Sequence, residues 1–64
     1  MERFNGVKVF TATKAKEREE LGAIVTLWLQ RNPQLRIVES RILQSSDSEF
    51  HCLTMVFFYL DEST

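Results

Sequence analysis

The longest apolar run of the chain is EFHCLTMVFFYL, at Glu49–Leu60. A run rich in aromatic and β-branched residues favours a β-strand, in which successive side chains point to opposite faces. One face then carries Phe50, Cys52, Thr54, Val56, Phe58 and Leu60, and the other carries His51, Leu53, Met55, Phe57 and Tyr59. Because both faces are apolar, we expect this strand to lie in the middle of its sheet, covered on both sides.

A strand and a helix are expected ahead of this run. Val7–Ala12 alternates in the manner of a strand that lies near a sheet edge. Thr13 is the expected N-cap of the helix, which should end near Arg31 because Pro33 disfavours helical backbone at the residue before it. The helix should face the sheet with an apolar stripe at helical spacing, formed by Leu21, Ile24, Val25 and Trp28 and widened by Leu29.

A second strand is expected at Leu35–Leu43, with Leu35, Ile37 and Leu43 on one face and Val38 and Ile42 on the other. Its charged residues fit an outer strand, where a charge discourages pairing with other chains. The polar segment at 44–49 predicts a turn, so that this strand and the apolar run form a hairpin.

These elements predict a single α+β domain over residues 1–64 with the order strand, helix, strand, strand. A right-handed crossover through the helix places the first two strands parallel, with a gap between them. The apolar third strand fills this gap antiparallel to both, which gives a three-stranded sheet in the order 1-3-2 with one helix packed on one face. The second face of the sheet then lacks a cover from the same chain.

The size of the chain favours self-association. A domain of 64 residues buries only about 60% of its unfolded surface. The single cysteine, Cys52, cannot form a disulfide within the chain, which also suggests a reducing, cytoplasmic setting. We therefore expect a homo-oligomer, with a dimer favoured, whose interface includes Met55, Phe57, Phe58 and Tyr59. A further protein partner is an additional possibility.

Composition argues against several other partners. The net charge of -1 offers no general attraction for nucleic acid or for an anionic membrane surface, and no apolar run is long enough for a transmembrane helix. No Cys and His spacing suits a metal site, because the chain has one residue of each kind. We expect neither a nucleic-acid nor a membrane partner, and no cofactor or metal.

Four groups of residues are candidate sites of chemistry. His51 and Cys52 are adjacent but should point to opposite faces of a strand, so they cannot act as a base and nucleophile pair. Lys14, Lys16 and Arg18 open the helix and could hold an anion, although acidic residues are interleaved with them. The Ser45–Ser48 loop could bind a cation or accept a phosphate, and Trp28 could stack on a flat ligand. None of these groups forms a catalytic set, so we do not expect an enzyme.

Two families share features with the chain. The opening Val7-Lys8-Val9-Phe10, the helix ending in Trp28-Leu29 and the closing strand at 53–59 resemble very small sporulation-associated proteins of Gram-positive bacteria. The strand, helix, strand, strand order and the ending Leu60-Asp61-Glu62 are similar to dodecins, which are flavin-storing assemblies of identical chains. Gln34 and Leu35 stand where dodecins place the aromatic residue that stacks on flavin.

Two functions are therefore expected from the sequence. The first is a non-enzymatic, homo-oligomeric interaction or regulatory module. The alternative is a carrier of a flavin-like small molecule, with a pocket at a subunit interface near Trp28.

Overall fold

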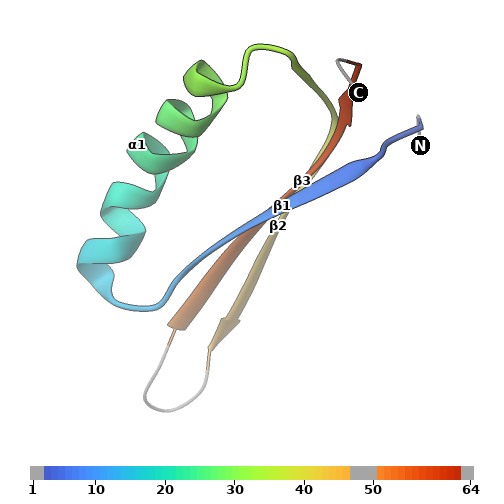
Figure 1. Ribbon diagram of the computed structural model, residues 1–64. Helices are drawn as coiled ribbons and strands as arrows, with labels where there is room; N and C mark the ends of the chain where they lie inside the picture. Colours follow the sequence, from blue (N-terminus) through green and yellow to red (C-terminus); the bar gives the residue numbers. More distant parts are fainter. Residues whose placement is uncertain (1–2, 47–50, 63–64) are drawn as a thin grey trace.

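The computed structural model, which describes residues 3–46 and 51–62, contains a strand, a helix and two further strands. They are β1 (Gly6–Ala12), α1 (Ala15–Arg31), β2 (Leu35–Ser46) and β3 (His51–Asp61). The strands form one three-stranded sheet in the order β1-β3-β2, and β3 is antiparallel to both neighbours (Figure 1). The predicted α+β fold and strand order are confirmed.

The molecule is flat and elongated, with extents of 43 × 23 × 13 Å. Figure 1 views the sheet from its β1 edge, with α1 along one side of the strands. None of the described elements lies on the other side of the sheet. One helix therefore supplies the only cover that this part of the chain gives the sheet.

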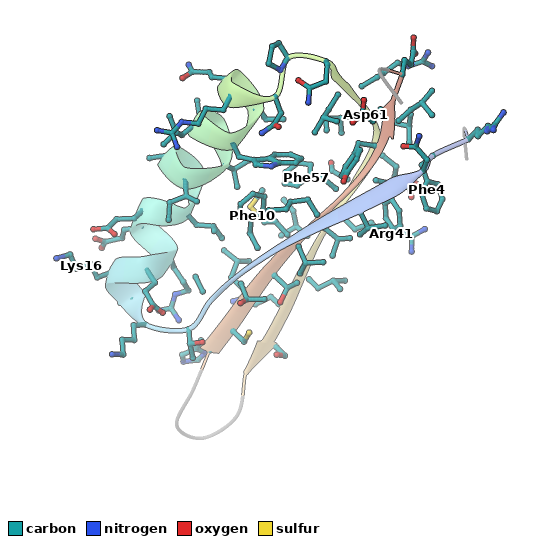
Figure 2. The ribbon with its side chains drawn as sticks, in the orientation of Figure 1. Phe4, Phe10, Lys16, Arg41, Phe57 and Asp61 are labelled. Carbon is teal, nitrogen blue, oxygen red and sulfur yellow. The ribbon has the colours of Figure 1, made fainter. Side chains whose placement is uncertain are left out.

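The faces of β3 follow the predicted alternation. Phe57 lies opposite Lys8 of β1, and its ring contacts the helix residue Trp28, with 5.9 Å between the centroids. Phe57 and the β3 residues two and four positions away therefore face α1, whereas Phe58 and Val56 face away from it. Figure 2 shows Phe10 and Phe57 between the sheet and α1, and Phe4 and Arg41 on the opposite side.

A β-bulge at Val38 changes the faces of β2. Ile37 pairs with Tyr59, but the next pair is Glu39 with Phe58, so Val38 is an extra residue. Beyond the bulge, the residues that face α1 have even numbers. The predicted faces of this strand are therefore wrong in part: Ile37 and Ile42 share the helix side, and Leu43 lies on the opposite side.

Helix α1 begins one residue later than predicted. Lys14, not Thr13, is the N-cap residue, and its side chain accepts no capping hydrogen bond. The carboxylate of Glu17 instead accepts hydrogen bonds from the backbone N–H of Lys14 at 3.0 Å and of Thr13 at 3.2 Å. These bonds satisfy two donors at the start of the helix, and they hold the pKa of Glu17 below its ordinary value, the Lys14 bond having the larger effect.

The predicted end of α1 at Arg31 is confirmed. Asn32 is the C-cap residue, and its side-chain amide donates a hydrogen bond of 2.8 Å to the carbonyl of Trp28. The carbonyl of Asn32 then accepts a bond from the N–H of Leu35, the first residue of β2. Asn32 thus closes the helix and starts the turn into the next strand.

The core between α1 and the sheet is small. Of the described residues, only Ala12, Leu21, Val25 and Phe57 form its buried centre, with exposed fractions of 3%, 3%, 6% and 7%. Trp28 packs beside them and contacts the rings of Phe10, Phe57 and Tyr59. Two members of the predicted helical stripe lie outside this core, since Ile24 is 49% and Leu29 38% exposed.

Candidate interaction surface

The sheet face opposite α1 carries an apolar surface formed by all three strands. The registers place Thr11, Thr54 and Leu43 in one row, Val9, Val56 and Arg41 in the next, and Val7, Phe58 and Glu39 in a third. We call the apolar residues of this surface, together with Thr54 between them, the open face; it comprises Val7, Val9, Leu43, Thr54, Val56 and Phe58. Its largest side chains are those expected in the interior of a protein.

Much of the open face is accessible to solvent. Val7 is 47%, Val9 51% and Leu43 56% exposed, while Val56 and Phe58 on the central strand are half-buried. Isolated exposed apolar residues are common, but these residues lie on adjacent strands and form a continuous patch.

Phe58 is flanked by two groups of its own chain. The Phe4 ring meets it edge to face, with 5.0 Å between the centroids, and the Arg41 guanidinium lies 5.8 Å from the centre of its ring. Phe4 itself is 40% exposed. The open face therefore has an aromatic pair at one end, with a cation beside it.

Among the described residues, the ion pairs on this side of the sheet involve β2 and the residue that follows β3. Arg41 Nε is 3.3 Å from Glu39 Oε2, and Arg36 Nη1 is 4.0 Å from Glu62 Oε1. The facing residues of β1 are Val7, Val9 and Thr11, none of which is charged. The open face thus has an apolar edge at β1 and a rim of both charge signs at β2.

The four residues predicted for an interface are divided between the two faces. Phe57 is buried under α1, and Met55 packs at the edge of the same core. Tyr59 also faces α1, with its ring 6.1 Å from that of Trp28. Only Phe58 belongs to the open face, so it is the member of this set available to a partner there. Participation of the other three in an interface stays a prediction.

His51 and Cys52 are brought to opposite faces, as their positions on a strand require. Cys52 is half-buried as a free thiol, with its sulfur 3.8 Å from the Thr54 hydroxyl. The carbonyl of His51 accepts a hydrogen bond of 3.1 Å from Arg18, which ties the start of α1 to the start of β3. The two side chains point to opposite faces of β3, so the imidazole of His51 cannot activate the thiol of Cys52 as a nucleophile.

At the start of α1, where Lys14, Lys16 and Arg18 could hold an anion, side chains of the protein already use several of the hydrogen-bonding groups. Glu17 already accepts hydrogen bonds from backbone N–H groups there, and Arg18 donates to the carbonyls of Thr13 and His51. Lys14 and Lys16 are exposed. Of the predicted Ser45–Ser48 loop, Ser45 is exposed at the end of β2, whereas Asp47 and Ser48 lie outside the described residues.

Within residues 3–46 and 51–62, no group of three or more His, Cys, Asp or Glu side chains could hold a metal ion. Trp28 uses its ring in contacts with Phe10, Phe57 and Tyr59, and the flavin-like ligand predicted near it stays a prediction. The one described helix is too short and too polar to span a bilayer.

The chain matches no protein-family model, no curated protein and no solved structure. The class of protein is therefore defined by the fold alone, as a β-α-β-β α+β domain with an open apolar sheet face. This surface was not recognised from the sequence as a set, since three of its members lie on strands other than β3. The β-branched alternation of Val7 and Val9 was the available signal.

Proposed function

We propose that this protein is a non-enzymatic interaction module that works as a homo-oligomer, in which the open face packs against the same face of a second copy. The observation that supports this most directly is the contrast between the two sides of the sheet. Among the described residues, one side has a buried centre of only four, and the other leaves Val7, Val9 and Leu43 about half exposed. Packing two open faces together would give each copy a second core.

The size of the open face is close to the lower limit for a specific interface. Strands are about 4.8 Å apart and rise about 3.3 Å per residue. The three strands β1, β2 and β3 together therefore present a surface of about 15 by 30 Å. Two such surfaces bury about 1,000 Å² or more when their side chains interdigitate, which approaches the range of specific interfaces. Each half-exposed valine or leucine that becomes buried contributes about 1 kcal/mol.

A second copy is the occupant that the charges favour. The β2 rim carries both Glu39 and Arg41, whereas the β1 edge of the open face has no charged residue. A two-fold axis brings identical surfaces together, so a rim that contains both signs can complement itself. A strongly acidic or basic partner would find no such complement.

Two neighbouring residues of β2 provide the test. Leu43 lies on the open face and is 56% exposed, whereas Ile42 lies on the helix side and is 65% exposed. Leu43→Lys places a charge in the proposed interface twice, once from each copy, and should weaken association by at least about 100-fold. Ile42→Lys makes the same chemical change on the same strand but outside the interface.

Sedimentation velocity across a concentration series measures the outcome. We expect the wild type and Ile42→Lys to form oligomers of the same size, and Leu43→Lys to form smaller species. Circular dichroism of each variant establishes that it is folded. A wild-type protein that remains monomeric at high micromolar concentration, or equal behaviour of the two variants, would contradict the proposal.

A further inference from the structure

Helix α1 has a second apolar surface that the core does not use. Ile24 and Leu27 are 49% and 45% exposed, and both Glu20 and Arg31 are also exposed. At 100° per residue, these four side chains fall within about 60° of one another on one flank of the helix. We call this set, Glu20, Ile24, Leu27 and Arg31, the helix flank.

The handedness of the fold places the helix flank above the outer edge of β1. The crossover from β1 through α1 to β2 is right-handed in Figure 1, and α1 runs antiparallel to β1. With Leu21, Val25 and Trp28 directed at the sheet, the turn of the helix directs Ile24 and Leu27 away from β2 and Leu29 towards it. The helix flank and the free edge of β1 therefore face the same side of the molecule.

The β1 edge is less protected than the β2 edge. Lys8 is the only charged residue of β1, and its pairing with β3 is continuous over Gly6–Ala12. In contrast, β2 has a bulge at Val38 and carries Arg36, Glu39 and Arg41. Charges and bulges are the features that prevent an edge strand from pairing with another chain.

We propose that a second copy of this chain docks along the β1 edge, with the two α1 helices packed antiparallel through their flanks. This interface is separate from the one at the open face and goes beyond it. The spacing of the four flank residues carries the proposal. A two-fold axis that passes between positions 25 and 26 sets Ile24 against the partner's Leu27, and the same axis sets Glu20 against the partner's Arg31.

Glu20 and Arg31 of one chain are too far apart to pair with each other. Glu20 and Arg31 are eleven positions apart, which corresponds to about 16 Å along a helix. Their opposite charges can meet only across an interface, and the two-fold axis forms this contact twice. The apolar pair lies between the two charge pairs, as in a small interface with a polar rim.

The position of α1 on the sheet suits this arrangement. Its core residues contact Ala12 and Phe10 of β1 and Phe57 of β3, so the helix lies over the boundary between these strands. If two β1 strands pair at the usual spacing of about 4.8 Å, helices above the two boundaries lie about 10 Å apart. This is within the usual range of distances between packed helices.

Two variants that each reverse one charge of the helix flank, measured alone and as a mixture, test the proposal. Both also carry Leu43→Lys, so that the open face does not contribute to association. Glu20→Arg gives a chain with two positive charges on the flank, and Arg31→Glu gives a chain with two negative charges. We expect each variant alone to associate at least about tenfold more weakly than the Leu43→Lys protein, because like charges then face each other. An equal mixture should form a heterodimer in which every contact is attractive.

Native mass spectrometry of the mixture, with one chain isotopically labelled, separates heterodimer from homodimers. A heterodimer in clear excess over the statistical proportion supports the proposal, and so does recovery of association in the double variant Glu20→Arg/Arg31→Glu. Heterodimer in only the statistical proportion overturns the proposal. So does a lack of association in all samples, that is, in the single variants, their mixture, the double variant and the Leu43→Lys protein. If Leu43→Lys alone leaves assembly unchanged, the proposal for the open face fails while this test remains valid.

Discussion

The side chain of Asn5 and the backbone of Asp61 exchange two hydrogen bonds at the end of the sheet. Asn5 Nδ2 donates to the carbonyl of Asp61 at 3.1 Å, and Asn5 Oδ1 accepts from the N–H of Asp61 at 2.9 Å. The N–H of Asn5 also donates to the carbonyl of Tyr59. The amide therefore extends the pairing of β1 and β3 beyond Gly6.

Asn5→Ala should lower the free energy of unfolding by about 1 to 2 kcal/mol, because it removes both side-chain bonds while leaving the backbone intact. Asn5→Asp keeps an acceptor for the N–H of Asp61 but loses the donor, and it places a carboxylate near that of Asp61. Its free energy of unfolding should therefore fall by as much as that of Asn5→Ala, or by more. Urea denaturation measures both, with Arg3→Ala as an exposed control. A loss for Asn5→Ala no greater than that of the control would contradict this role.

Gly6 is required by the ring that lies over it. A Cβ at this position would overlap the ring of Tyr59, which is itself in contact with Trp28. Gly6→Ala should therefore displace the tyrosine and destabilise the fold by about 1 to 3 kcal/mol. Because Tyr59 packs on the only tryptophan, the emission of Trp28 should change as well. Unchanged stability and fluorescence would show that the ring moves without cost.

Replacement of Gly22 should stabilise the protein, in contrast to replacement of Gly6. Close packing of the helix on the sheet does not explain this glycine, because a Cβ there would have no atom within 4 Å in the described structure. Gly22→Ala should raise the free energy of unfolding by about 0.5 to 1 kcal/mol, because alanine loses less conformational freedom in a helix. Chemical denaturation of the Leu43→Lys background gives this value without a contribution from assembly at the open face. A destabilising effect would indicate a partner at this position.

The limits of sequence interpretation are visible in these examples. The apolar run at 49–60 was sufficient to predict the central strand and its alternation, because period-two patterning reflects a local property of the backbone. The contact between Gly6 and Tyr59 joins residues far apart in the sequence, and no local pattern indicates it. The bulge at Val38 was missed for a related reason, since an extra residue is defined only by the strand that pairs with it.

The sequence did not indicate which aromatic residues of β3 lie under α1 and which lie on the open face, and the site of assembly depends on this division. Met55, Phe57 and Tyr59 were correctly grouped on one side of β3, but the sequence did not establish which side the helix would cover. The structure places this group under α1 and leaves Phe58 on the open face. The expectation of assembly now depends on Phe58 and on valines from β1 and β3, because Phe57 is only 7% exposed.

Stability should depend on pH through Glu17. Hydrogen bonds from the N–H groups of Lys14 and Thr13 hold the pKa of Glu17 below its ordinary value in the folded protein. The Glu17 carboxylate therefore stabilises the fold at pH values above its pKa in the unfolded chain, which is about 4.3. This stabilisation is lost as the pH falls through the lower pKa that Glu17 has in the folded protein. The stability advantage of the wild type over Glu17→Gln should therefore shrink between pH 6 and pH 3. A difference that stays constant over this range would contradict the assignment.

Deletion of Val38 tests whether the bulge determines the faces of β2. Without this residue, Ile37 and Glu39 become neighbours with regular alternation, and their partners Tyr59 and Phe58 are already neighbours on β3. Every other β2 side chain then keeps its face, so we expect the fold to persist with a loss of about 1 to 2 kcal/mol from the half-buried valine.

Deletion of Arg41 is the matched control, because it removes one residue from a regular part of the same strand. Ile42 and Leu43 would exchange faces or lose register with β3, and this change should cost far more than the lost side chain. Amide NMR spectra and urea denaturation compare the two deletions. Retention of the native spectrum by the Val38 deletion alone supports the pairing; equal disruption by both deletions would mean that the bulge itself is needed for the twist of the sheet.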